Sequence, residues 1–113
     1  MEKENLKTKL DSILKRLDSL STYSSTNALD LIECIFEFFE YENHLLELKV
    51  PQIAGVRDDL KELEKKILAL FQDMPGQYGE ALKSNIYKDS RLKLKLYISR
   101  ISSGLDSLPV NEI

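Results

Sequence analysis

The chain has 113 residues, and its composition excludes several classes of protein. Sixteen Lys and Arg against nineteen Asp and Glu give a net charge of −3, which excludes a histone-like nucleic-acid binder and an acidic tail. Hydrophobic residues make up 42% of the chain, enough to fill a core and to exclude disorder as the default state. Twenty leucines against four glycines and three prolines are typical of a helical protein.

Cysteine usage and hydropathy indicate the setting of the protein. Cys34 is the only cysteine, so an intramolecular disulfide and a cysteine-based zinc site are excluded, and a reducing, cytoplasmic location is expected. Residues 1–20 carry nine charges and lack the apolar region of a signal peptide. Three acidic residues interrupt the most hydrophobic run, residues 28–39, so no membrane span is predicted.

The spacing of apolar residues predicts a first helix over residues 4–20. Its apolar stripe is narrow, as in a helix on the outside of a bundle or in a coiled-coil seam. The stripe consists of Leu6, Leu10, Ile13, Leu17 and Leu20. A Ser/Thr-rich break follows, and Asn27, with Asp30 three residues later, is predicted to cap the second helix.

The second helix, residues 27–49, is apolar over about 240° of its circumference, which indicates burial on more than one side. One face is expected to fill the core; it contains Ala28, Ile32, Ile35, Phe39 and Leu46. The offset face is predicted to bind a partner through Leu31, Phe38, Tyr41 and Leu45. The alternative is that this helix is central and that both faces are filled within one chain.

Two further helical segments follow. Val50-Pro51 ends the second helix, and a third stripe runs from Ile53 through Val56 to Met74, with a start between residues 51 and 56. Beyond Pro75-Gly76, two stripes out of phase predict a short helix over residues 78–87, a kink or cap at Asp89-Ser90, and a helix to about residue 107.

These elements predict an all-α fold, an antiparallel four-helix bundle whose last helix is kinked or split near Asp89-Ser90. Residues 1–108 are expected to form one domain, and residues 109–113 a short tail. The second helix region, residues 21–50, carries −5, and residues 82–100 carry +5, so these two segments are expected to lie close together.

Three groups of side chains could carry chemistry. The polar stripe of the second helix lacks the paired Glu-x-x-His motifs of a di-metal site, so a solvated acidic face is expected; the stripe consists of Glu33, Glu37, Glu40, His44 and Glu47. Cys34 has apolar and acidic helical neighbours, which favour a buried, unreactive thiol. A basic cluster is spread around the last helix and consists of Lys83, Lys88, Arg91, Lys93, Lys95 and Arg100.

The predicted function is that of a small, non-catalytic protein–protein interaction module, such as an adaptor, chaperone, inhibitor or complex subunit. No nucleophile, base and orienting group can be assembled, so no enzyme activity, cofactor or metal is expected. Self-association is a possible form of this interaction, a homodimer included. The alternative is a nucleic-acid-associated regulator that uses the basic last helix, although net negative charge predicts weak or absent binding of nucleic acid.

Overall fold

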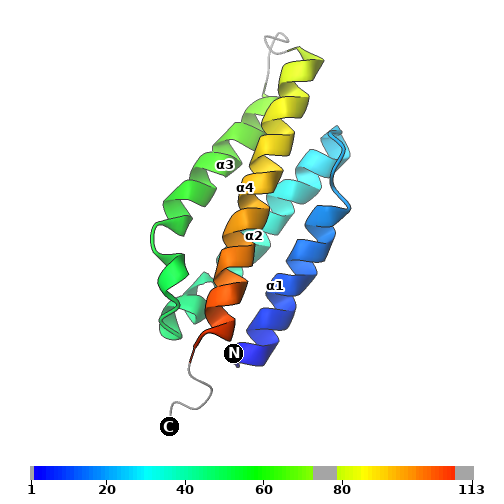
Figure 1. The fold of residues 1–113 in the computed structure, drawn as a ribbon. Coiled ribbons are helices and arrows are strands. Elements are labelled where there is room, and N and C mark those ends of the chain that lie inside the picture. Colours follow the sequence, from blue (N-terminus) through cyan, green and yellow to red (C-terminus); the bar gives the residue numbers. More distant parts are fainter. Residues whose placement is uncertain (1, 73–78, 109–113) are drawn as a thin grey trace.

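The computed structural model describes residues 2–72 and 79–108, and this part of the chain forms an all-α bundle (Figure 1). Successive helices run in opposite directions, as predicted. The elements are α1 (Lys3–Asp18), α2 (Ser25–Glu47), the 3-10 turn η1 (Pro51–Ile53), α3 (Val56–Phe71) and α4 (Glu80–Asp106). None of the helices in these ranges combines the length and the apolar character needed to cross a membrane.

The helices form a ring in which α4 packs against both α3 and α1, and α2 packs against the same two helices. In Figure 1, α4 lies in front and α2 behind it, with α1 and α3 on either side. The prediction that the acidic second helix and the basic last helix lie side by side is therefore wrong. In a ring of four, each helix has its chain neighbours beside it, so α2 and α4 take diagonal positions and meet only across the core.

The ion pairs follow this arrangement. Glu37 of α2 pairs with Arg16 of α1, and Lys95 of α4 pairs with Asp18 of α1 at 2.6 Å. Lys7 near the start of α1 pairs with Asp106 at the end of α4 at 2.9 Å. Among the described residues no ion pair joins α2 to α4, so α1 carries the complementary charges for both.

Two side chains of α4 bind the carbonyl groups at the end of α1. The hydroxyl of Tyr87 donates to the Leu20 carbonyl at 2.5 Å, and Nε of Arg91 donates to the Leu17 carbonyl at 2.7 Å. The last carbonyls of a helix have no partner within it, and a cation there also interacts favourably with the helix dipole. Tyr87 is fully buried and its ring lies 5.5 Å from that of Tyr23.

The ends of α2 differ from the sequence-based expectation. Ser24, and not Asn27, is the N-cap residue, since its side-chain hydroxyl accepts a hydrogen bond from the backbone N–H of Asn27. The helix therefore begins at Ser25, two residues earlier than predicted. At the other end Lys49 has a left-handed backbone with φ of 58°, and the amide of Val50 donates to the Leu45 carbonyl at 3.3 Å. This hydrogen bond, which is characteristic of a Schellman motif, places the buried Val50 against the end of the helix.

The stripe predicted for α3 is confirmed over the described residues. Gly55 precedes the helix with φ of 76°, a left-handed conformation that other residues adopt at a cost. Pro51 belongs to the separate turn η1 and not to α3 itself. The buried residues of η1 and α3 are Ile53, Val56, Leu60, Leu63, Ile67 and Leu70. The last position of the predicted stripe, Met74, and the terminator Pro75-Gly76 lie outside the described residues, as do residues 109–113.

The predicted split at Asp89-Ser90 is absent, because α4 is one continuous helix of 27 residues. Ser90 is buried and continues the inward stripe between Tyr87 and Leu94. By contrast, in the first of the two predicted stripes, which consists of Tyr78, Leu82 and Ile86, Leu82 is exposed and Ile86 is half-buried against the core, while Tyr78 lies outside the described residues. Because Ser90 is polar but occupies a core position, the apolar pattern of the sequence is interrupted there, although the helix itself continues.

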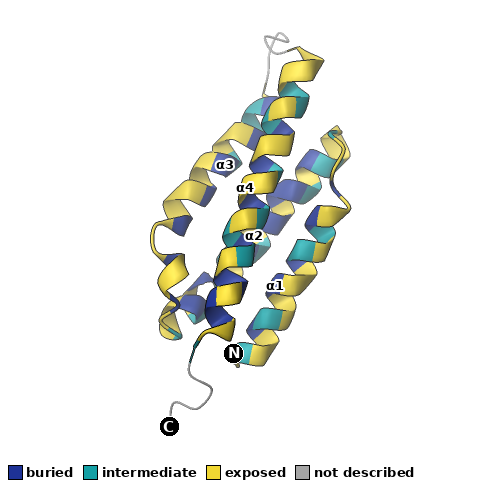
Figure 2. Cartoon of the chain, in the orientation of Figure 1, coloured by how far each residue is buried: buried dark blue, intermediate teal, exposed yellow. Residues whose placement is uncertain are grey.

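Buried side chains from all four helices and η1 meet in one core (Figure 2). Gly104 allows a close approach there, since a Cβ at this position would lie 3.1 Å from Cγ1 of Val50 and still closer to the side chain of Gln52. The glycine that weakens the end of α4 by its propensity is thus the residue that lets η1 pack on this helix.

Replacing Tyr87 with Phe is expected to lower the free energy of unfolding by about 1–3 kcal/mol, because the Leu20 carbonyl loses its partner. Urea denaturation at pH 7 measures this. Tyr23→Phe is the control, since no hydrogen bond is formed by that hydroxyl within the described residues.

The same variant tests a pH dependence. Burial raises the pKa of Tyr87 to about 12, above the usual value of 10.0. The folded state holds this proton more tightly than the unfolded state, so stability falls as the pH rises from 10 towards 12. Tyr87→Phe is expected to show a smaller fall over that range, and an unchanged slope would contradict the assignment.

Candidate functional site

Three of the four residues predicted to bind a partner lie in the core. Leu31, Phe38 and Leu45 are fully buried within the chain, with an exposed fraction of 0%. Tyr41 is half-buried, and its hydroxyl donates to Oε1 of Glu37 at 3.3 Å. The expectation that this face is accessible is therefore wrong for the three aliphatic and aromatic core residues. Of the four, only Tyr41 could meet a partner without opening of the bundle.

The neighbourhood of Tyr41 is a polar contact between α1 and α2. Glu37 accepts from both Arg16 and Tyr41. Burial raises the pKa of the Tyr41 phenol, and the nearby carboxylate of Glu37 raises it further. This phenol is therefore held protonated beside the salt bridge of Arg16 and Glu37.

The accessible apolar surface of α2 lies on another side of the helix. Leu29, Phe36 and Leu46 expose 52%, 49% and 53% of their surfaces. Leu46 belongs to the face expected in the core, whereas Leu29 and Phe36 belong to neither of the two predicted faces of this helix. Because the apolar sector of this helix spans about 240°, periodicity alone does not fix how the helix is rotated about its axis. That rotation determines which apolar residues are buried and which are exposed.

Glutamates alternate with these apolar residues along the outside of α2. We name as the acidic face the exposed residues Leu29, Glu33, Phe36, Glu40 and Glu47, which share one side of the helix, whereas Leu46 lies about 100° around the axis from Leu29. Neither Glu40 nor Glu47 forms an ion pair with any described residue. Glu37 and His44, the other members of the predicted acidic stripe, are half-buried. In the described ranges no group of side chains is arranged to hold a metal ion.

A second exposed surface lies on α4, diagonally across the bundle from the acidic face. Leu92 and Leu96 expose 57% and 47% of their surfaces, one helical turn apart. We name as the basic face the residues Lys88, Leu92, Lys93, Leu96 and Arg100, which are all exposed (Figure 2). Lys93 pairs with Asp89 within the helix at 3.1 Å, whereas Lys88 and Arg100 form no ion pair with described residues.

Sequence reasoning missed both Glu42 and the hollow between α3 and α4. Glu42 is buried within α2 and pairs with Arg57 of α3 at 3.4 Å. The Arg57 side chain is 64% exposed, and the other carboxylate oxygen of Glu42 has no hydrogen-bond partner among the described residues, so this pair is a weak source of stability. A charged residue on the apolar side of a helix is the signal that could have marked it.

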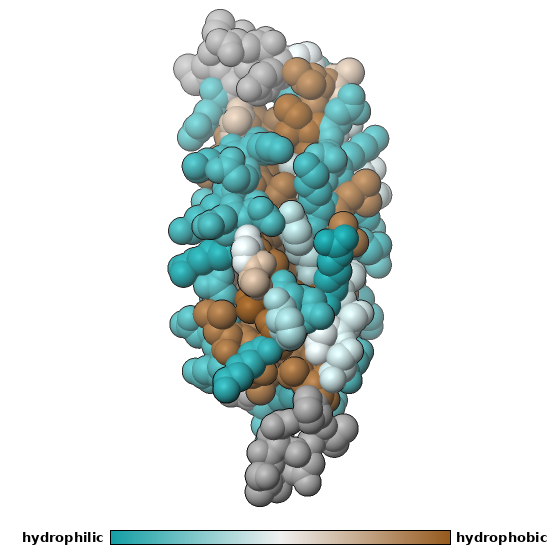
Figure 3. Space-filling view, turned by 60° about the vertical axis from the view of Figure 1, so that its left-hand side comes forward, coloured by the Kyte–Doolittle hydropathy of each residue, from teal (hydrophilic) through white to brown (hydrophobic). Residues whose placement is uncertain are grey.

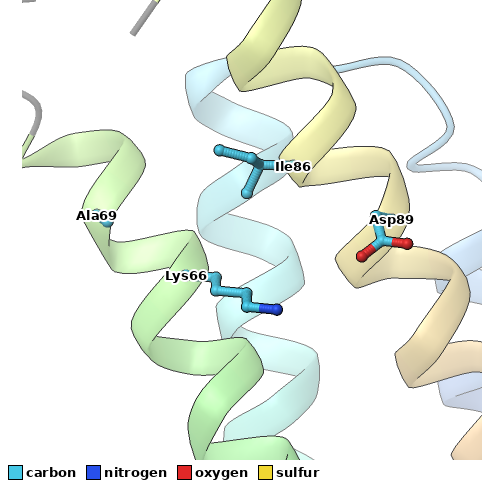
Figure 4. A pocket seen from close by; sticks show the side chains of 4 residues that line it. All are labelled: Lys66, Ala69, Ile86 and Asp89. Atoms are coloured by element: carbon cyan, nitrogen blue, oxygen red, sulfur yellow. The ribbon is translucent and has the colours of Figure 1, made fainter. Parts of the chain in front are cut away.

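The hollow has a volume of about 230 Å³ and is lined by Lys66, Ala69, Ile86 and Asp89 (Figure 4). Lys66 extends from α3 toward α4 in this view. The volume is below the range of about 300–1,000 Å³ that ligand sites occupy. Around this hollow, the surface of the bundle on the α3 side is largely covered by hydrophilic side chains, and hydrophobic side chains gather near the two ends of the bundle (Figure 3). This hollow does not have the features of a small-molecule site.

Cys34 is buried, as expected, and burial raises the pKa of its thiol to about 11. Arg16 lies close enough to lower that pKa in part, a neighbour on α1 that the sequence did not reveal. The thiol is therefore protonated at neutral pH and is not a nucleophile.

A thiol reagent at pH 8 is expected to modify Cys34 in the native protein at least about 100-fold more slowly than in urea, because the reactive thiolate forms only when the bundle opens. Mass spectrometry over time measures the rate. Cys34→Ala with Ser21→Cys, which places a thiol at an exposed site, is the control and is expected to react rapidly. Rapid labelling of native Cys34 would contradict its burial.

No protein-family model matches the chain, and neither the curated proteins nor the solved structures contain a significant match. Its function is therefore to be inferred from its own surfaces, the acidic face and the basic face above all.

Proposed function

We propose that this chain is a non-catalytic protein–protein interaction module whose acidic face on α2 binds a partner that presents a basic, amphipathic helix. The observation that carries the proposal is the exposure of Phe36, about half of whose surface lies in water in the middle of a helix. Single exposed apolar residues are common on protein surfaces, but here Leu29, two helical turns before Phe36 on the same side of α2, is equally exposed.

The arrangement of charges selects the partner. Phe36 lies between Glu33 and Glu40 along the helix, so an apolar centre is bordered by carboxylates. Covering such a centre removes apolar surface from water, at about 25 cal/mol per Å². Carboxylates at the border add little affinity, but they raise the rate of encounter with a basic surface and disfavour an acidic one.

The described residues support a non-catalytic role. Cys34 is buried and protonated, and its position offers no access to a substrate. The chain has only one imidazole, that of His44, on the half-buried edge of α2. A cytoplasmic location remains part of the proposal, because a single buried thiol suits a reducing compartment.

The placement of the basic residues favours a protein partner over a nucleic acid. Arg91 and Lys95 point to α1, where they bind the Leu17 carbonyl and Asp18. Lys93 pairs with Asp89. Cations engaged within the chain are not available to neutralise phosphates, and this engagement weakens the case for a nucleic-acid-associated regulator.

A photo-crosslinking amino acid placed at Phe36 tests the proposal in cells of the native source. We expect covalent adducts from this position, because the partner covers it. The control replaces Lys61, an exposed residue on the outside of α3, and is expected to yield none. Adducts that are absent at position 36, or equally abundant at both positions, would contradict the proposal.

Binding to nucleic acid is expected to be weak. In a fluorescence titration at physiological salt, a 20-base-pair DNA duplex or RNA hairpin is expected to bind with a dissociation constant no tighter than about 100 μM, the weak limit of non-specific binding. Sub-micromolar affinity that falls steeply with salt would instead favour the nucleic-acid alternative.

A further inference from the structure

The chain itself carries a surface of the kind that the acidic face is proposed to bind. On the outside of α4, Leu92 and Leu96 form an apolar pair. Lys88 and Arg100, which form no ion pair with described residues, border it, and Lys93 beside them is paired with Asp89. The acidic face has the opposite pattern, with Phe36 bordered by Glu33 and Glu40. From this complementarity we propose that the protein associates with itself head to tail, the acidic face of one copy on the basic face of the next. This inference rests on the proposed role of the acidic face.

The diagonal placement of α2 and α4 determines the geometry of such a complex. The two faces point away from each other on opposite sides of one bundle. A copy bound through its acidic face therefore keeps its basic face free, and further copies can add in the same direction. A contact between two different surfaces that does not close on itself produces open chains of subunits.

Like charges disfavour the symmetric alternatives. Two acidic faces in contact would bring Glu33, Glu40 and Glu47 of both copies together, and two basic faces would do the same for Lys88 and Arg100. Charges of the same sign across an interface oppose association, whereas the head-to-tail contact brings opposite charges together.

The contact is expected to be weak and sensitive to salt. One helix packed on one helix buries less surface than the roughly 800 Å² per partner of a stable interface, so a dissociation constant between about 10 μM and 1 mM is expected. Because the bordering charges are exposed, an increase from about 0.05 M to 0.5 M NaCl should weaken association severalfold.

Sedimentation velocity of the full chain, over concentrations up to about 1 mM, tests the inference with two variants. Phe36→Asp disables the acidic face and Leu92→Asp disables the basic face, and each variant alone is expected to be a monomer. Mixed together, they are expected to form a one-to-one dimer that grows no further, because each variant supplies the surface that the other has lost. Asn5→Asp adds the same charge at an exposed site of α1, and this control is expected to associate like the wild type. Circular dichroism shows that each variant is folded.

Other outcomes separate this inference from the proposed function. Association lost in Phe36→Asp but retained in Leu92→Asp would mean a symmetric contact through α2, and would overturn the head-to-tail arrangement. A wild-type chain that stays monomeric over the whole range would also overturn it. In both cases crosslinks from position 36 to a different protein would still support the acidic face as a docking surface, whereas their absence would remove the proposed function as well.

Discussion

The buried hydrogen bond from Tyr87 to the Leu20 carbonyl joins the first helix to the last, and the positions of the other two helices depend on that junction. Nearby, Arg91 binds the Leu17 carbonyl, so the end of α1 is held by α4 through two groups. Once α1 and α4 are neighbours, the ring of four helices is closed and α2 must lie diagonally opposite α4. The separation of the two exposed faces follows from this closure and not from any contact between them.

Electrostatics within the chain makes the same arrangement favourable. Helix α1 is placed between an acidic helix and a basic one, and it meets them with Arg16 and Asp18 respectively. These exposed and partly exposed pairs contribute little to the free energy of unfolding. Their effect is on orientation, because each pair is formed only when the correct helix lies on the correct side of α1.

Periodicity predicted the bundle well where the apolar stripe is narrow. For α1 and α3 the stripe leaves one possible inward direction, and its described members are buried as expected. It failed where residue type and burial disagree. Ser90 occupies a core position and Leu92 an exposed one, so α4 was read as two segments. On α2 the apolar sector is so wide that it fits several rotations, and packing chose the rotation that buries Phe38 and exposes Phe36. Three of the four residues predicted to bind a partner are therefore buried in the core, and the exposed apolar residues of α2 lie on another side of the helix.

Lys7, in the second turn of α1, reaches both Asp106 and Ser102 near the end of α4. The order of the helices around the ring is therefore cyclic, and the place where the chain is opened is not dictated by packing. A short linker from residue 108 to residue 2 would close the backbone, and new termini could be made between the exposed residues Ser21 and Thr22, beyond the buried Leu20. In such a circular permutant α1 would follow α4 in sequence as it already does in space. The contacts between α1 and α4 would then be local in sequence, and the contacts between α1 and α2 would join the two ends of the chain.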